Sequence, residues 1–359
     1  MPEHQEPTQQ SSPEVAIDAR TWPLAPEKKL AGLPIFLRTL LALERAGAGA
    51  LVVHPGEHRA RLERLLARRA PRIPVTFAGD DAPAQAPVGH VFAACALYEP
   101  ARLADAVAGH GAPSDAVWCP LASGADLARA SGLLWRSLRK PIENDGVVAY
   151  FLGRPVSRLI SRLIIATPVT PNQVTIASGL TALAGAFALT QHLILGAALY
   201  WLSFVLDCVD GELARLKYQG SRTGQWLDTI ADDTATVAFS IGLSYLLLDG
   251  HATWAWVGLA AAGAYALSCI PVYRALRHLP TVDTAQYPYF FMGEKGAAAT
   301  EKNLWTHLAY GFRRDVILFI HLVFSLFGFL WGMYALQLTI NAGMAFITWL
   351  DVSVKALRK

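Results

Sequence analysis

The distribution of hydrophobic residues divides the chain at about residue 140. Before this point, short apolar runs alternate with amphipathic stretches, as in a soluble α/β domain. From residue 172 onward, apolar stretches recur that are about 20 residues long, the length that an α-helix needs to cross a bilayer. The pattern predicts an α-helical integral membrane protein with six transmembrane helices, at 173–191, 193–217, 226–249, 252–274, 315–335 and 337–355.

The N-terminal part is predicted to form a small α/β domain over residues 27–140. Helical periodicity covers residues 33–46, 57–69 and 100–108, and short apolar runs typical of buried parallel strands cover 50–54, 75–77 and 91–94. Residues 1–26 are rich in Pro, Gln, Ser and Glu and are predicted to be a flexible tail.

Residues 141–171 are predicted to form a juxtamembrane segment that precedes a membrane domain at 172–359. Arg154, Arg158 and Arg162 follow one another at four-residue intervals among leucines and isoleucines. This pattern is typical of an interfacial helix against anionic headgroups, and a solvated helix face is the alternative. Asn172, in the run PVTPNQVT, is predicted to cap the first transmembrane helix.

Basic residues lie on one side of the predicted spans. The connections around His192, residues 249–252 and Gln337 contain no Lys or Arg, whereas the opposite connections and both flanks are basic. The positive-inside rule therefore predicts cytoplasmic N- and C-termini, in the inner or plasma membrane if the source is bacterial. The net charge of +3 is too small to indicate nucleic acid, so lipid headgroups and phosphates are the expected anionic partners.

Four aspartates lie on two of the predicted helices, in the run DCVDGELARLKYQGSRTGQWLDTIAD from Asp207 to Asp232. Asp207 and Asp210 are three residues apart, and Asp228 and Asp232 are four apart, so each pair lies on one helical face. Carboxylates that face each other at membrane depth repel unless cations lie between them, so the run predicts a divalent metal site at the cytoplasmic end of these helices. Chance acids or a satisfied buried ion network are the alternatives.

The spacing D-x2-D-G-x2-A-R-x8-G-x3-D-x3-D resembles the motif of the CDP-alcohol phosphotransferases, also called CDP-alcohol phosphatidyltransferases. The resemblance implies an enzyme in which an acceptor hydroxyl attacks the β-phosphate of a CDP-alcohol and CMP leaves. It implies two Mg²⁺ ions, with Mn²⁺ as the alternative, and Asp232 as general base and metal ligand. The metal ligands are expected to be Asp207, Asp210, Asp228 and Asp232, and the CDP-binding residues Gly211, Ala214, Arg215 and Gly224.

The sequence does not determine which donor and which acceptor the enzyme uses. The donor could be CDP-diacylglycerol, its ether analogue or CDP-inositol, and the acceptor could be inositol phosphate, glycerol phosphate or another alcohol. Basic residues near the membrane are candidates for binding a phosphate on the acceptor, namely Arg154, Arg158, Arg313 and Arg314. Positive-inside anchoring explains the last two equally well. The resemblance also implies a homodimer and a role in phospholipid or inositol-phosphate lipid synthesis.

The run AGLPIFLRTLLALERAGAGALVV resembles the segment that follows the nucleotide loop of sugar-phosphate nucleotidyltransferases. No glycine-rich loop precedes it, so we expect the N-terminal domain to be a non-catalytic relic. Some inositol-handling members of the family are fused to an active cytidylyltransferase, and this chain looks like a reduced relative of them. A membrane transferase is the leading interpretation, and a non-enzymatic scaffold or a bifunctional cytidylyltransferase and transferase are the alternatives.

Overall fold

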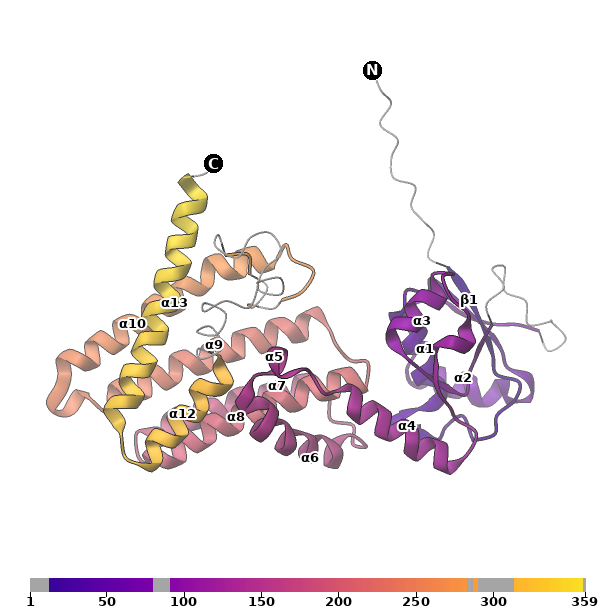
Figure 1. The fold of residues 1–359 in the computed structure, drawn as a ribbon, viewed down its shortest axis with the longest axis horizontal. Coiled ribbons are helices and arrows are strands. Elements are labelled where there is room, and N and C mark those ends of the chain that lie inside the picture. The colour runs from indigo at the N-terminus through magenta and orange to yellow at the C-terminus, as the bar shows by residue number, and fades with distance from the viewer. Residues whose placement is uncertain (1–12, 80–90, 283, 285–286, 290–312, 358–359) are drawn as a thin grey trace, which may run out of the picture. The chain divides into compact units, whose positions relative to one another are not determined.

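The computed structural model describes residues 13–79, 91–282, 284, 287–289 and 313–357 (Figure 1). The chain divides into two compact units. The first unit comprises residues 1–139 together with 216–218, and the second comprises residues 140–215 and 219–359. The boundary near residue 140 is the one that the hydrophobic pattern predicts.

The first unit is built on a four-stranded parallel sheet in the order β5-β4-β1-β6. Ile17, Leu51 and Phe92 from three of these strands are fully buried and pack with Phe36 and Leu40 of helix α1. The strands are β1 Glu14–Asp18, β2 Lys29–Leu30, β3 Leu33–Pro34, β4 Ala50–His54, β5 Val75–Phe77, β6 Val91–Ala93, β7 Ala96–Tyr98 and β8 Val117–Pro120. The helices are α1 Ile35–Arg45, η1 Gly56–His58, α2 Arg59–Arg68, α3 Pro100–Val107, η2 Pro113–Ala116 and α4 Gly124–Ser137. The predicted α/β class is confirmed.

The predicted flexible tail at residues 1–26 is wrong for its second half. Glu14–Asp18 forms β1, which pairs with β4 on one side and with β6 on the other. Val15, Ala16 and Ile17 are buried there, but a run of three apolar residues is too short to predict a strand from sequence. Residues 1–12 lie outside the described part of the chain.

The second unit is helical (Figure 1). Its elements are α5 Ile142–Asp145, a π-helical turn Ala149–Gly153, α6 Arg154–Ile164, α7 Pro171–Leu189, α8 Leu193–Leu216, α9 Arg222–Tyr245, α10 Leu248–Leu276, α12 Arg314–Leu326 and α13 Leu330–Leu357. Within the described residues, α7, α8, α10 and α13 are long and apolar enough to cross a membrane. This supports a multi-pass membrane protein.

Two of the six predicted spans do not meet these criteria. α9 has 24 residues but carries acidic and hydroxyl side chains along its length. α12 has 13 residues and is thus about 20 Å long, whereas the hydrocarbon core is about 30 Å thick. The exact count of six is therefore a proposal, and four candidate spans are shown.

The connection predicted around Gln337 is also wrong. The chain turns at residues 327–329 instead, where Gly328 has a φ of +65°, and Gln337 lies buried inside α13. The actual connection contains no Lys or Arg either, so the orientation argument from basic residues is unchanged. The predicted break at 249–252 is confirmed, because Asp249, Gly250 and His251 have non-helical backbone angles.

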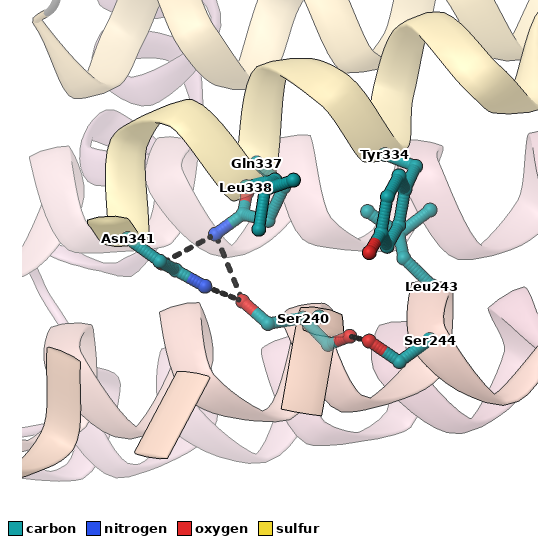
Figure 2. Close-up of a pocket in the computed structure, with 8 residues that line it drawn as sticks. Ser240, Leu243, Ser244, Tyr334, Gln337, Leu338 and Asn341 are labelled. Carbon is teal, nitrogen blue, oxygen red and sulfur yellow. Dashed lines mark hydrogen bonds between the residues drawn. The ribbon is translucent and has the colours of Figure 1, made fainter. Parts of the chain in front are cut away.

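Gln337 is tolerated inside α13 because its side chain is fully engaged between helices (Figure 2). Its Nε2 donates to Ser240 Oγ at 3.0 Å and to Asn341 Oδ1 at 3.2 Å, and its Oε1 lies 3.0 Å from His321 Nε2. Asn341 Nδ2 also donates to Ser240 Oγ, at 2.8 Å. All four side chains are buried, so this network joins α9, α12 and α13 in the apolar interior.

Replacing Gln337 by leucine is expected to lower the free energy of unfolding of the helical unit by about 1 kcal/mol, as for other hydrogen bonds between membrane helices. The substitution leaves His321 and Asn341 without one partner each. Thermal unfolding in detergent measures the effect. Thr339→Val is the matched control, because Thr339 is exposed and its hydroxyl bonds only Ala335 O of the same helix. Equal melting temperatures for the two variants would show that the network adds no stability.

Candidate active site

The acidic motif occupies the ends of α8 and α9 that the loop at 217–221 connects. Ser221 starts α9, because its Oγ accepts a hydrogen bond from Gly224 N at 3.0 Å. Asp207 and Asp210 come from α8 and Asp228 from α9, and each offers a carboxylate oxygen within 4.8 Å of the others. We call these three residues the acidic triad. Asp232 follows one turn later on α9.

The acidic triad fits a divalent cation. Asp210 is buried, and Asp228 Oδ1 is buried and has no hydrogen-bond partner among the described residues. An all-oxygen, carboxylate-rich ligand set suits Mg²⁺, and Mn²⁺ prefers similar ligands. A positively charged side chain lies beside the triad. The guanidinium of Arg314 contacts Asp232, and its Nη1 is 3.9 Å from Asp207 Oδ2. The site therefore favours positive charge.

Thr175 orients one of these carboxylates, and the sequence reasoning missed it. Its hydroxyl donates to Asp210 Oδ2 at 2.5 Å and is buried. The position of Thr175 follows from the start of α7, where Thr170 and Gln173 form a capping box. The cap predicted at Asn172 is thus wrong, because Asn172 lies inside the first turn and Thr170 holds the capping position.

Thr175→Val is expected to lower the turnover of the site by about tenfold, because Asp210 loses the hydroxyl that fixes its orientation. Valine keeps the shape of the side chain, so packing changes little. Thr175→Ser keeps the hydroxyl and should retain most of the activity. Release of the nucleotide product under saturating substrate measures both variants, and equal losses would indicate that packing rather than the hydrogen bond matters.

A cavity of about 310 Å³ lies beside the acidic triad, within the helical unit. The triad and Asp145 supply its acidic lining. Its basic lining consists of Lys140, Arg154, Arg215 and Arg313. Gly211 also borders it, so the structure brings Gly211 and Arg215 to the triad as the motif predicts. The cavity is large enough for part of a polar, charged substrate.

Gly224 lies close to the side chains of Asn172 and Ser221. A Cβ atom at this position would lie 2.8 Å from Asn172 Oδ1 and 3.1 Å from Ser221 Oγ. A larger residue here would therefore displace the side chain of Asn172 at the start of α7. Ala214 and Gly224 do not belong to the lining of the cavity, and their predicted contact with CDP stays a prediction.

Arg154, one of the predicted acceptor residues, is held by buried acids. Its Nη2 lies 2.6 Å from Asp145 Oδ1 and its Nη1 lies 3.3 Å from Glu212 Oε1. Ser157 and Ser161 also donate to Glu212, at 2.8 and 2.7 Å. We call these five residues the α6 ion network; all are buried. The network joins α6 to α8. The spacing of residues in the sequence did not predict that Glu212 or Asp145 would contact Arg154.

The exposed side of α6 carries apolar side chains together with Arg162. Val156, Leu159 and Leu163 are exposed, whereas the polar Ser157 and Ser161 point inward. The expected contact of Arg154 with headgroups is therefore wrong, since this side chain points into the protein. An exposed apolar face still fits a helix at the boundary between headgroups and acyl chains.

The two arginines that precede and open α12 have different surroundings. Arg314 contacts Asp232, whereas Arg313 borders the cavity and its Nε lies 3.7 Å from Asp315 Oδ1. Asp315 is buried and accepts a hydrogen bond from Ala149 N at 3.0 Å. Arg158 does not line the cavity.

Asp233 adjoins the motif but turns away from it. It accepts hydrogen bonds from the hydroxyls of Tyr265 at 2.6 Å and Tyr273 at 2.5 Å, both on α10. Asp233 thus links α9 to α10 beside the site, a role that only the structure reveals.

Comparison with known proteins identifies the family of the chain. The family model described as CDP-alcohol phosphatidyltransferase matches residues 168–349. A Thermococcus kodakarensis protein named bifunctional IPC transferase and DIPP synthase is 31% identical over 177 residues, which cover 45% of this chain and 40% of the relative. Proteins with the same name are 29% identical over 151 residues in Aquifex aeolicus and 37% identical over 123 residues in Rubrobacter xylanophilus. These matches cover 42% and 34% of this chain, and 35% and 26% of the relatives, so the chain spans well under half the length of these curated relatives.

Proposed function

We infer that this chain, which belongs to the CDP-alcohol phosphatidyltransferase family, transfers a substituted phosphate group from a CDP-alcohol to an acceptor alcohol and releases CMP. The observation that carries the proposal is the acidic triad, whose three carboxylate oxygens lie within 4.8 Å of one another next to the cavity. A divalent cation held by such a site would supply the positive charge that a diphosphate needs for binding and for departure of its leaving group.

Asp207, Asp210 and Asp228 are the proposed metal ligands, and Asp232 is the proposed fourth. Two Mg²⁺ ions are the proposed occupants, with Mn²⁺ as the alternative. When bound, the metal supplies positive charge that neutralises the diphosphate and polarises its phosphorus. The hydrogen bond from Thr175 restrains the orientation of the Asp210 carboxylate.

Asp232 is the proposed general base. Its carboxylate takes the proton of the acceptor hydroxyl while the hydroxyl oxygen forms a bond to the β-phosphorus. The bond between this phosphorus and the oxygen of CMP breaks, and CMP leaves with the electron pair. Arg314 contacts Asp232 and holds the carboxylate in place. Gly211, Ala214, Arg215 and Gly224 form the proposed CDP side of the site.

The choice of substrates is also a proposal. The relatives are named IPC transferase and DIPP synthase, and with the inositol-phosphate chemistry expected from sequence this favours a CDP-inositol type of donor over CDP-diacylglycerol. Arg313 borders the cavity, which supports a contact with the acceptor. Arg158 is a weaker candidate because it does not line the cavity, and Arg154 and Arg314 are weaker because each contacts an aspartate.

The proposed setting is a multi-pass membrane protein with six spans, cytoplasmic termini and a site that opens to the cytoplasm. Four candidate spans and the basic flanks of the apolar stretches support it. A homodimer, a non-catalytic N-terminal domain and a role in phospholipid or inositol-phosphate lipid synthesis complete the proposal.

The test is acceptor-dependent release of CMP from purified protein in detergent with Mg²⁺. CDP-diacylglycerol and CDP-inositol are supplied separately, each with inositol, inositol phosphate, glycerol and glycerol phosphate. Release that requires one donor and one acceptor supports the transferase and identifies the donor. Binding of neither donor and no release with any pair would favour the scaffold, and CTP consumption by the chain would favour the bifunctional alternative.

A further inference from the structure

The connection between α8 and α9 is held by side chains of the first unit, the α/β unit. Residues 216–218 end α8 and begin its connection to α9, yet they belong to the first unit together with residues 1–139. Arg38 of α1 donates from Nη2 to Leu216 O at 2.8 Å. Arg69, which directly follows α2, donates from Nη2 to Tyr218 O at 2.9 Å. Two arginines of the α/β unit therefore fix the main chain of this connection.

Arg38 is a buried cation, with 2% of its surface exposed. Its guanidinium also donates to Leu30 O at 2.8 Å and to Ala31 O at 3.2 Å, in the tight turn between β2 and β3. Among the described residues, its hydrogen-bond acceptors are main-chain oxygens. A buried charge is costly unless dipoles face it, and the C-terminus of α8 supplies the negative end of a helix dipole at Leu216. The side chain of Arg38 thus caps α8.

Tyr218 has a backbone conformation that needs support from its surroundings. Its φ is +51°, in the left-handed region that residues with a side chain rarely adopt. Arg69 bonds its carbonyl oxygen, and the guanidinium carbon of Arg38 lies 5.6 Å from the centre of its ring. That distance fits a cation–π contact. These contacts with the α/β unit stabilise the turn that the chain makes after α8.

The connection determines how the carboxylates of the acidic triad lie relative to one another. Gln219 N donates to Ala214 O at 2.9 Å, which closes α8, and Ser221 caps α9. Asp210 lies six residues before the last residue of α8, and Asp228 lies six residues after the first residue of α9, about 9 Å along each helix axis. Helices are stiff over this length, so a change in the connection moves one set of carboxylates relative to the other.

We propose that the α/β unit positions the acidic triad, with Arg38 and Arg69 as positioning residues that hold the connection between α8 and α9. This rests on the proposed function and assigns a role to a unit that has no glycine-rich nucleotide loop. A connection that is already fixed lowers the conformational entropy that the chain loses when the three carboxylates enclose a cation. A divalent cation therefore binds more tightly when both arginines are in place.

The test uses the full chain in detergent and the variant Arg69→Met. Arg69 is half-buried and lies outside the hydrophobic core of the α/β unit, so its substitution leaves that core intact. Arg69→Lys keeps a charged donor for Tyr218 O. Arg68→Met is the matched control, because Arg68 is the neighbouring residue at the end of α2 and is exposed. Melting curves show that each variant is folded.

Two measurements are made on each protein. The dissociation constant for Mn²⁺ is obtained from the electron paramagnetic resonance signal of the free ion, and Asp228→Asn identifies the binding that belongs to the acidic triad. Hydrogen–deuterium exchange, read by mass spectrometry, follows the peptides that cover residues 207–228 and 29–38. Neither measurement depends on turnover, so both remain informative whichever substrates the enzyme uses.

We expect Arg69→Met to raise the dissociation constant for Mn²⁺ by about tenfold and to speed exchange across residues 207–228. Arg69→Lys should restore most of the affinity, and Arg68→Met should match the wild type. Coupling between two sites is reciprocal, so Mn²⁺ should slow exchange of residues 29–38 in the wild type, and less so in Arg69→Met.

A purely structural role of Arg69 would lower the melting temperature and leave the affinity of the folded protein for Mn²⁺ unchanged, which would overturn the proposal. Equal exchange across residues 207–228 in Arg69→Met and the wild type would overturn it as well, while the transferase would stand. Absence of both Mn²⁺ binding and CMP release in the wild type would contradict the proposed function. Exchange across residues 207–228 that depends on Arg69 would even then support positioning of these helices by the α/β unit.

Discussion

Asp228→Asn is expected to lower acceptor-dependent CMP release by at least about 10³-fold while leaving the protein folded. The acidic triad loses one of its three charges, and an amide cannot replace an ionised carboxylate as a metal ligand. Asp228 is the only member that α9 contributes to the triad, so the substitution removes the one triad carboxylate that this helix supplies. CMP release under saturating substrates measures the loss.

The stability of this variant should move in the opposite direction from its activity. Asp207, Asp210 and Asp228 repel one another in metal-free buffer, so removing one charge relieves repulsion. With a chelator present, we expect the melting temperature of Asp228→Asn to equal or exceed that of the wild type. Adding Mg²⁺ or Mn²⁺ should raise the melting temperature of the wild type and not of the variant.

Asp249→Asn is the matched control for this prediction. Asp249 is an exposed aspartate at the kink near the start of α10, away from the triad, so its substitution should change neither activity nor the response to metal. Full activity of Asp228→Asn would contradict the metal site, and a lowered melting temperature in chelator would show that Asp228 stabilises the fold instead.

Arg154→Met is expected to lower the free energy of unfolding by about 3–5 kcal/mol, because it leaves Asp145 and Glu212 buried without their countercharge. Methionine fills a similar volume, so the loss reflects charge rather than a cavity. Unfolding of the purified protein in detergent, by heat or by a denaturing detergent, measures the change. Activity should fall with stability, because the α6 ion network holds α6 against the helix that carries Asp207 and Asp210.

Arg154→Lys provides the graded comparison. Lysine keeps the charge but lacks the planar group that contacts Asp145 and Glu212 together, so it should recover part of the stability. Ser161→Ala removes one neutral donor to Glu212 and should cost about 1 kcal/mol. If the Arg154→Met protein were stable and active but had lost affinity for the acceptor, Arg154 would bind the acceptor, as predicted from sequence.

Prediction from sequence succeeded where the signal is local. Asp207 and Asp210 lie on one helical face because the period of a helix is fixed, and the same holds for Asp228 and Asp232. The strands at 50–54, 75–77 and 91–93 were recognised by their apolar runs and flanking turns. By contrast, a polar residue in an apolar run has the same local pattern whether a helix ends there or not, and so Gln337 was mistaken for a connection.

The sequence by itself thus determined the class of the protein, the membrane character of its second half and the carboxylates of its site, because spacing along a helix and the length of an apolar run are properties of neighbouring residues. The tertiary structure alone decided which partners these residues have. Thr175 reaches Asp210 across 35 positions of the chain, Arg154 reaches Glu212 across 58, and Gln337 reaches Ser240 across 97. Contacts between distant segments depend on how helices pack, since burial forces each polar group to find a partner wherever the fold places one.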